Sequence, residues 1–263
     1  MPIFTLHIWS FVLAPTWYGL MYALSFYGFF VAMKRQKIPE RQIDTLLIFT
    51  ILGVVLWGRI GYVLLYNFPY YREHILEILM PWKGWMSFHG GAVWVIIGWY
   101  CAARRMKISF LRLSDNLVWI VPFGLLLGRI GNYINGELFW LPGYLGFWAK
   151  IIDGVSYFPT PLLESLLEGV ILGGILYWKK NNITYPGQLG IWFLGGYGIA
   201  RFAAEFFRTP DIQVGYIMSN WITMWHILSF GMIAISILLH FLLRNKNSKD
   251  QKNLLNYSKE SLQ

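Results

Sequence analysis

The sequence predicts an all-α integral membrane protein: a bundle of seven transmembrane helices with a small outward-facing cap, an outside N-terminus and an inside C-terminus. Composition is the first reason, because 56% of the 263 residues are hydrophobic and 13% are charged, whereas soluble domains average about a quarter charged. The second reason is a series of apolar runs of about 20 residues, the length that crosses a bilayer. The third is an uneven distribution of Lys and Arg between alternate loops.

Charged or Pro/Gly-rich turns divide the apolar runs into seven predicted spans, which fall near residues 17–33, 44–66, 87–103, 114–134, 161–178, 187–207 and 221–243. Residues 1–244 would then form one transmembrane domain, and residues 245–263 a polar cytoplasmic tail that we expect to be disordered. The loop at about 138–160 is rich in Trp, Tyr, Phe, Gly and Pro, and we assign the cap to it. The N-terminus lacks the basic segment that begins a cleaved signal peptide.

Alternate loops differ in their content of Lys and Arg, which are retained on the cytoplasmic side during insertion. The basic loops hold Lys34, Arg35, Lys37, Arg41, Arg104, Arg105, Lys107, Arg112, Lys179, Lys180, Arg244, Lys246, Lys249, Lys252 and Lys259. The opposite loops hold only Arg72, Lys83, Lys150 and Arg208. This difference predicts the orientation. Basic loops that face anionic lipid also explain the net charge of +9, so we expect no nucleic-acid partner.

The stretch 125–138 carries polar side chains at the end of an apolar segment, namely Arg129, Asn132, Asn135 and Glu137. The first three are spaced three residues apart and would share one face of a helix. An ionisable residue within a membrane span indicates a functional site with a partner. The alternative is that Arg129 is buried only to pair with a carboxylate during assembly of the bundle.

The sixth predicted span ends with Arg201, Glu205 and Arg208, which share a helical face at positions i, i+4 and i+7. These residues could form a structural ladder of ion pairs. However, two cations exceed one carboxylate, and the surplus charge favours an anion. Arginine suits phosphate because its planar guanidinium donates two parallel hydrogen bonds. A phospholipid headgroup is therefore the expected ligand.

Other candidates lie at the predicted outer edge of the spans. His89 is flanked by glycines at the start of the third span and could exchange a proton near neutral pH, although a lone His is more often a packing residue. Tyr18 either anchors the first span at the interface or lines the site. Glu164 and Glu168 could balance Arg59 or Arg129. No His, Cys and Asp spacing indicates a metal site.

Six motifs, in this combination and order, resemble the prolipoprotein diacylglyceryl transferase family over nearly the whole chain before the tail. They are Trp-Tyr-Gly-Leu-Met-Tyr (17–22), Gly-Arg-Ile-Gly-Tyr-Val-Leu-Leu-Tyr-Asn-Phe-Pro (58–69), Met-Ser-Phe-His-Gly-Gly (86–91), Gly-Arg-Ile-Gly-Asn-Tyr-Ile-Asn-Gly-Glu-Leu (128–138), Leu-Leu-Glu-Gly (166–169) and Arg-Phe-Ala-Ala-Glu-Phe-Phe-Arg-Thr-Pro-Asp (201–211).

The resemblance implies an enzyme of the bacterial inner (plasma) membrane that transfers a diacylglyceryl group from phosphatidylglycerol to a thiol. The acceptor would be the lipobox cysteine of a prolipoprotein signal peptide, and glycerol phosphate would be released. The active site would face the outer, periplasmic side of this multi-pass protein. Residues 1–244 would be the catalytic domain, and no metal or organic cofactor is implied.

The resemblance marks eight positions of this chain as important, namely Tyr18, His89, Arg129, Asn132, Glu137, Arg201, Glu205 and Arg208. We expect the guanidinium groups of Arg129 and Arg201 to stabilise charge on the departing phosphate. His89 is the first choice for the base that removes the thiol proton, with Glu137 or Glu205 second. The remaining residues, together with Asn135 and Arg59, would bind the substrate.

The chain departs from the family pattern in its predicted outward half. Trp140 stands where a glycine is usual, residues 158–164 lack the usual His, Gln and Tyr, and Trp225-His226 replaces a usual Gly-Gln. A divergent member or paralogue is therefore also consistent with the sequence. It could use a different acceptor, or bind phospholipid without transferase activity. A transporter is a weaker alternative, because paired discontinuous helices are barely indicated.

Overall fold

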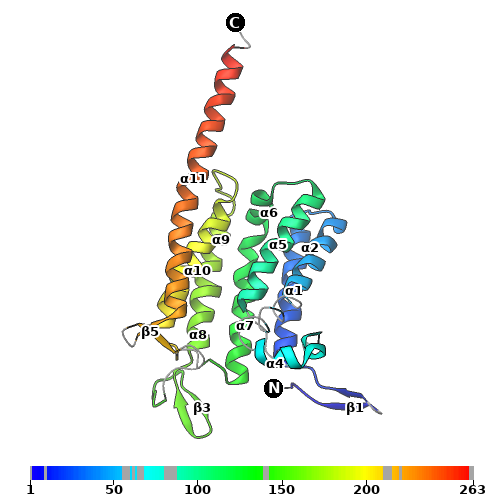
Figure 1. Cartoon of the computed structure of the whole chain (residues 1–263), viewed down its shortest axis with the longest axis vertical. Coiled ribbons are helices and arrows are strands. Elements are labelled where there is room, and N and C mark those ends of the chain that lie inside the picture. The colour runs from blue at the N-terminus through cyan, green and yellow to red at the C-terminus, as the bar shows by residue number, and fades with distance from the viewer. Residues whose placement is uncertain are drawn as a thin grey trace. The chain divides into compact units, whose positions relative to one another are not determined.

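The computed structural model describes residues 2–8, 11–54, 60, 63, 68–79, 88–138, 142–209, 215–218 and 221–260 (Figure 1). These residues form mainly helices, with three short antiparallel hairpins. The chain divides into two units, one made of residues 1–29 with 115–263 and the other of residues 30–114. The first unit holds most of the predicted site residues.

The elements follow one another in a simple order. The α-helices are α1 (Trp17–Arg35), α2 (Glu40–Leu52), α4 (Phe68–Glu73), α5 (Phe88–Met106), α6 (Phe110–Leu117), α7 (Val121–Asn135), α8 (Thr160–Glu164), α9 (Leu172–Lys179), α10 (Gln188–Glu205) and α11 (Met224–Glu260). Two 3-10 helices, η2 (Ile75–Leu79) and η4 (Val118–Ile120), and one π-helix, η5 (Ser165–Ile171), complete the helical segments. The hairpins are β1–β2 (Leu6–Ile8, Phe11–Leu13), β3–β4 (Lys150–Ile152, Val155–Tyr157) and β5–β6 (Tyr216–Met218, Ile222–Thr223).

In the unit of residues 30–114, α2 packs directly against α5 because small residues lie at the contact. A Cβ atom on Gly98 would lie 2.9 Å from the backbone oxygen of Phe49. A polar bond reinforces the contact: the indole N–H of Trp99 donates to Thr50 Oγ1 at 2.9 Å. Close backbone approach with a few interhelical hydrogen bonds is the usual way in which helices associate in lipid.

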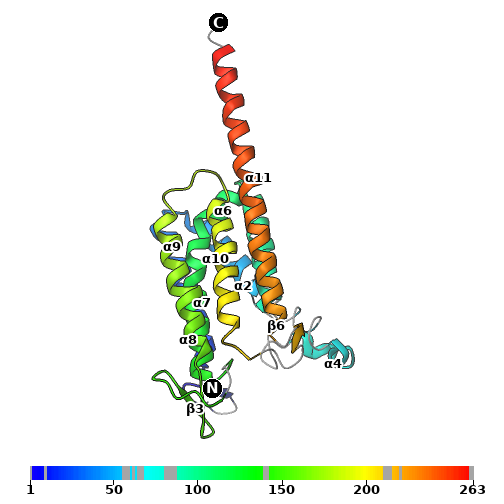
Figure 2. The same cartoon turned by 90° about the vertical axis from the view of Figure 1, so that its left-hand side faces the viewer.

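In the other unit, α7 packs against η5 and α10 packs along α11, and both views show the second pair side by side (Figures 1 and 2). Gly169 of η5 allows the first contact, because a Cβ atom there would lie 2.7 Å from the Cβ of Leu126. A buried cluster of Val118, Leu172, Leu176, Leu189 and Tyr197 joins η4, α9 and α10.

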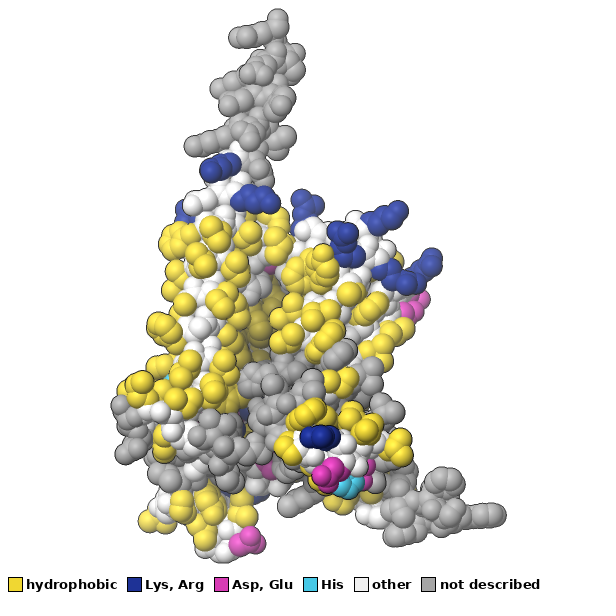
Figure 3. Space-filling model, viewed as in Figure 1, with side chains coloured by type: hydrophobic (Ala, Val, Ile, Leu, Met, Phe, Trp, Pro, Cys, Tyr) yellow, Lys and Arg dark blue, Asp and Glu magenta, His cyan; other side chains and the backbone are white. Residues whose placement is uncertain are grey.

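Three described helical segments are long and apolar enough to cross a membrane, namely Phe110–Asn135, Thr160–Lys179 and Met224–Lys249. Much of their apolar surface is exposed, as expected for helices that face lipid. Figure 3 shows hydrophobic side chains along the first half of α11 and Lys and Arg side chains where its apolar run ends. The prediction of a helical membrane protein is therefore confirmed. The count of seven spans and the orientation stay predictions.

Helices occupy six of the seven predicted spans. In the remaining one, 44–66, α2 covers the beginning, and residues 55–59, 61–62 and 64–67 lie outside the described part of the chain. The three hairpins depart from an all-α fold, and β3–β4 lies within the predicted cap.

The tail differs from the disordered segment that we expected, because α11 continues through it to Glu260. Residues 245–260 contain no Gly or Pro. A helix that is already formed extends at little cost, since nucleation is the unfavourable step.

Candidate functional site

The first part of the site forms where α7 ends. Gly136 adopts a left-handed conformation, with φ of +76°, which glycine adopts without steric cost and which commonly ends a helix. The N–H of Glu137 then donates to the carbonyl of Asn132 at 3.0 Å. This turn brings the Glu137 side chain back beside the helix it follows.

Three predicted residues meet at this turn. The Tyr18 hydroxyl, on α1, donates to Glu137 Oε2 at 2.7 Å. The amide nitrogen of Asn132 donates to the Tyr18 hydroxyl and, at 3.3 Å, to the same Glu137 oxygen. We call this group the Tyr18–Asn132–Glu137 triad. Asn135, the last residue of α7, is partly buried and engaged in contacts of its own.

The second part of the site is a buried network of six charged side chains, which we call the Arg–Glu cluster. It draws its members from α7, α8, η5, α10 and the turn after α10, and they are Arg129, Glu164, Glu168, Arg201, Glu205 and Arg208. All three carboxylate side chains are fully buried. A buried charge is tolerated only when it is paired and hydrogen-bonded.

Each carboxylate of the cluster lies within ion-pair distance of two arginines, and Glu164 lies between Arg129 and Arg201. Its Oε2 lies 3.0 Å from Arg129 Nη1, and its Oε1 pairs with Arg201 Nη1. Glu168 Oε2 accepts from both Nε and Nη2 of Arg129 at 3.1 Å. Glu205 Oε2 accepts from Arg201 Nη2 at 2.7 Å and lies 3.8 Å from Arg208 Nη1.

Local sequence explains how one span presents two carboxylates to the same guanidinium. Pro159 and Pro161 flank the start of α8, where a missing N–H costs nothing. The helix then widens into the π-helical turn η5 immediately after Glu164. Such π-helical turns occur mostly as short insertions and are frequent at functional sites. Here Glu164 and Glu168 lie on either side of the change in pitch, and both reach Arg129.

The predicted surplus of positive charge is wrong for the described residues. The cluster contains three guanidinium groups and three carboxylates, so its formal charges cancel. The pattern Arg201, Glu205 and Arg208 within α10 could not show this, because Glu164 and Glu168 come from a different helix. The balancing of Arg129 by these two carboxylates, which we had considered, is confirmed.

The three arginines differ in access. The Arg129 side chain is 14% exposed, Arg208 7%, and Arg201 is fully buried. The Trp225 ring lies over the Arg201 guanidinium, with its centroid 4.3 Å from the guanidinium carbon. Among the cluster members, Arg129 therefore offers the most accessible cation to a ligand.

A second layer of contacts holds Glu205. The Thr223 hydroxyl donates to Glu205 Oε1 at 2.8 Å, and the Thr223 backbone N–H donates to His226 Nδ1 at 3.2 Å. His226 also packs against Phe202 and Phe206. Thr223 escaped notice, since its only sequence signal is its place two residues before the unusual Trp225-His226 pair.

Two predicted residues cannot be placed in the site. The backbone of His89 belongs to the first turn of α5, but its side chain lies outside the described residues, as do all atoms of Arg59 and Trp140. Within the described part of the chain, no group of three or more His, Cys, Asp or Glu side chains is arranged to hold a metal ion.

Comparison of the sequence with known proteins places this chain in a family. The model of the family described as prolipoprotein diacylglyceryl transferase matches residues 6–242. The chain belongs to the prolipoprotein diacylglyceryl transferase family. Every member of the triad and of the Arg–Glu cluster lies within the matched residues, so the resemblance inferred from the motifs is confirmed.

Relatives in this family cover almost the same length. One from Hydrogenovibrio crunogenus is 40% identical over 242 residues, which is 85% of this chain and 88% of the relative. One from Methylococcus capsulatus is 39% identical over 233 residues, with the same coverage of each chain. One from Francisella tularensis subsp. mediasiatica is 39% identical over 254 residues, 88% of this chain and 91% of the relative. Each is named phosphatidylglycerol–prolipoprotein diacylglyceryl transferase.

Proposed function

We propose that this protein transfers the diacylglyceryl group of phosphatidylglycerol to the thiol of a prolipoprotein's lipobox cysteine. The observation that carries the proposal is about 40% identity, over nearly the full length, to relatives that bear this name. We further propose that residues 1–244 form the catalytic domain of a seven-span protein of the bacterial inner membrane. Its N-terminus and active site would face outward, and residues 245–263 would be cytoplasmic.

The reaction is a substitution at carbon. The cysteine sulfur, as thiolate, forms a bond to the glyceryl carbon that carries the phosphate. The bond between that carbon and the phosphate oxygen breaks, and glycerol phosphate leaves with the electron pair. The thiol proton goes to a base on the enzyme. Negative charge grows on the departing oxygen, so hydrogen-bond donors that are already in place there lower the barrier.

Arg129 is the residue that we place against the phosphate. A guanidinium has five N–H donors; Arg129 donates from Nε and Nη2 to Glu168, and its Nη1 forms an ion pair with Glu164 at 3.0 Å. N–H groups on both terminal nitrogens therefore remain for the ligand. Because two buried carboxylates from one helical segment hold the group, it does not need to reorganise as charge develops.

Arg201 has a different role in this proposal from the one expected at first. It is fully buried and pairs with Glu164 and Glu205, so we assign it to positioning, acting on Arg129 through Glu164. Asn132 of the triad lies on the same helix as Arg129. The triad would orient the headgroup, with Asn135, Arg208 and Arg59 as further substrate-binding residues.

His89 remains the first choice for the base. Glu137 is the second choice, since it belongs to the partly buried triad rather than to the cluster. Glu205 is a weaker one, because its oxygens already accept from Arg201 and Thr223.

The proposal is tested by incubating purified protein with phosphatidylglycerol and a peptide that contains a lipobox. We expect the peptide to gain the mass of one diacylglyceryl group and glycerol phosphate to accumulate. Arg129→Lys should lower the rate by about 10²-fold or more, because the side chain keeps its charge but loses its forked geometry. The matched control is Arg72→Lys at an exposed position of α4, which should retain the wild-type rate. Phosphatidylglycerol binding without product from the folded wild-type protein would refute transfer and leave a phospholipid-binding protein.

A further inference from the structure

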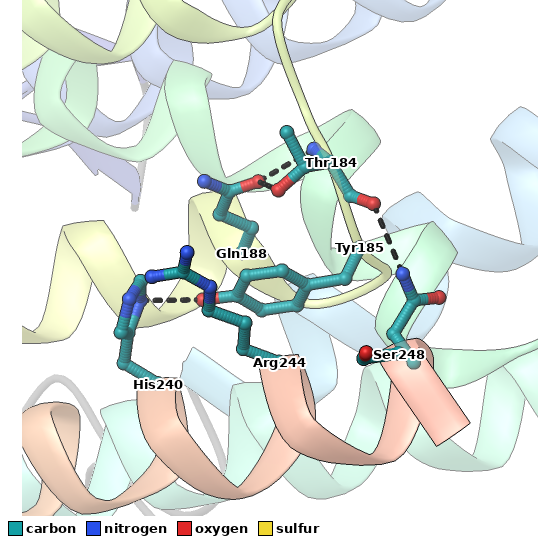
Figure 4. Close-up of a pocket in the computed structure, with 7 residues that line it drawn as sticks. Thr184, Tyr185, Gln188, His240, Arg244 and Ser248 are labelled. Carbon is teal, nitrogen blue, oxygen red and sulfur yellow. Dashed lines mark hydrogen bonds between the residues drawn. The ribbon is translucent and has the colours of Figure 1, made fainter. Parts of the chain in front are cut away.

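A second polar site lies at the opposite end of α10 from the Arg–Glu cluster. A pocket of about 390 Å³ opens between α11 and the loop that joins α9 to α10 (Figure 4). Its lining residues are Thr184, Tyr185, Gln188, His240, Arg244, Asn247 and Ser248. None of them belongs to the proposed catalytic machinery.

The wall of the pocket is held in place by its own hydrogen bonds. The Tyr185 hydroxyl lies 2.6 Å from His240 Nδ1, and Asn247 Nδ2 donates to the Thr184 carbonyl at 3.4 Å. Gln188 Oε1 accepts from the backbone N–H of Thr184 at 2.6 Å and from its hydroxyl at 3.0 Å. These bonds join the loop to α10 and α11 on both sides of the opening.

The groups that remain for a ligand are mainly donors. With its oxygen engaged by Thr184, the Gln188 side chain keeps its amide N–H groups. The Arg244 side chain lies beside the Tyr185 ring, with its guanidinium toward the Tyr185–His240 hydrogen bond (Figure 4). None of the ion pairs found among the described residues involves Arg244.

No carboxylate belongs to the pocket lining. The nearby acidic group is Asp115, whose two oxygens accept from the backbone N–H groups of Gly187, Leu189 and Gly190 at 2.7, 2.8 and 3.3 Å. The Asp115 carboxylate is therefore bound to the N-terminus of α10, where the helix dipole favours an anion. The pocket itself keeps the positive charge of Arg244.

Along α11, the pocket lies where the apolar run ends, which is the level expected for lipid headgroups. The apolar run of this helix ends at Leu243, and Arg244 follows directly. Lys179 and Lys180, at the end of α9, stack on Trp178 and Trp119 at 4.5 and 3.9 Å, as cations do beside the aromatic belt of a bilayer. Anionic lipid gathers at such basic surfaces.

We propose that this pocket binds a phosphate group, with Arg244 as the charged contact and the Gln188 amide and the Ser248 hydroxyl as further donors. Its volume falls within the range of small-molecule sites, so a phosphate with an attached glycerol fits. The phosphate could come from an anionic phospholipid of the leaflet at this end of the helices or from a soluble ester. This inference does not depend on the proposed transferase activity.

The test measures binding to the full-length protein in two arms. In the lipid arm, protein from phosphatidylcholine nanodiscs with or without phosphatidylglycerol is analysed by native mass spectrometry for retained lipid. In the soluble arm, inorganic phosphate is titrated against detergent-solubilised protein at constant ionic strength, and thermal unfolding is followed. The variants are Arg244→Gln and, as matched control, Lys246→Gln, which removes the same charge from an exposed residue outside the pocket.

We expect Arg244→Gln to weaken phosphate-dependent binding about tenfold, the usual effect of losing a charged hydrogen-bond donor, while Lys246→Gln binds as the wild type. A loss in the lipid arm assigns the site to a headgroup, and a loss in the soluble arm assigns it to a free ester. Equal losses in both variants, equal retention of phosphatidylcholine, or no dependence on Arg244 in either arm would overturn the proposal. Because Arg244 is exposed, both variants should fold, and their unfolding temperatures check this.

Discussion

Replacement of Glu164 by glutamine tests whether the Arg–Glu cluster acts as a unit. The side chain is fully buried and contacts Arg129 at 3.0 Å and Arg201 as well. Glutamine has the same shape but no charge, and its amide N–H₂ group would face one guanidinium, donor against donor. The cluster would also change from formally neutral to one excess positive charge.

The magnitude follows from the two contacts. At about 4 Å and an effective dielectric constant near 20, each ion pair is worth roughly 4 kcal/mol before desolvation is subtracted. Removing one partner of a buried pair costs about 3–5 kcal/mol in practice. We therefore expect Glu164→Gln to lower the free energy of unfolding by about that amount. Because Arg129 loses one of its two anchors, kcat should fall by about 10²-fold even in the folded fraction.

The assay combines denaturant unfolding in detergent with transferase kinetics at a temperature where the variant is folded. Glu73→Gln, at an exposed position of α4, is the control and should change neither quantity. A loss of activity only in proportion to the unfolded fraction would mean that Glu164 supports the bundle but does not position Arg129. An unfolding free energy within about 1 kcal/mol of the wild type would refute the strong coupling inferred from burial.

Two further predictions address the triad and the packing of the smaller unit. Tyr18→Phe removes the donor to Glu137 and should raise KM for phosphatidylglycerol about tenfold, the usual cost of a lost hydrogen bond to a charged group. The control, Tyr22→Phe, should leave KM unchanged. An unchanged KM for Tyr18→Phe in a lipid titration would count against the triad as a headgroup site. Gly98→Ala places a Cβ atom 2.9 Å from a backbone oxygen and should lower the free energy of unfolding by about 1–3 kcal/mol. In Gly174→Ala the added Cβ atom has no neighbour within 4 Å. The same denaturation experiment should therefore find this variant as stable as the wild type or more stable.

Helix positions were largely predictable because the thickness of the bilayer sets the length of a spanning helix, and that length appears in the sequence as an apolar run of about 20 residues. Six of the predicted spans coincide with helices for this reason. The hairpins were not predictable to the same degree, since strands of two or three residues leave almost no periodic signal. The tail was misjudged because composition alone does not reveal that a polar segment continues from a stable helix.

The site was predictable residue by residue but not as a charge balance. Polar groups in an apolar segment need partners. For this reason the sequence alone indicated Arg129, Asn132 and Glu137 as site residues. The partners of Arg129 lie 35 and 39 residues further along the chain, and only the fold shows that Glu164 is shared with Arg201. Pairing between helices depends on packing that a helical period within one helix does not encode.

Charge neutrality changes how an anion would be recognised in this protein. A cluster with surplus positive charge would attract any anion, whereas a neutral one offers no such general pull. What remains is directional: the N–H groups on the terminal nitrogens of Arg129, which is held by Glu164 and Glu168 and is the most exposed cation of the cluster. Binding would then depend on matching those donors to phosphate oxygens. The carboxylates that cancel the charge therefore also supply the rigidity on which this recognition depends.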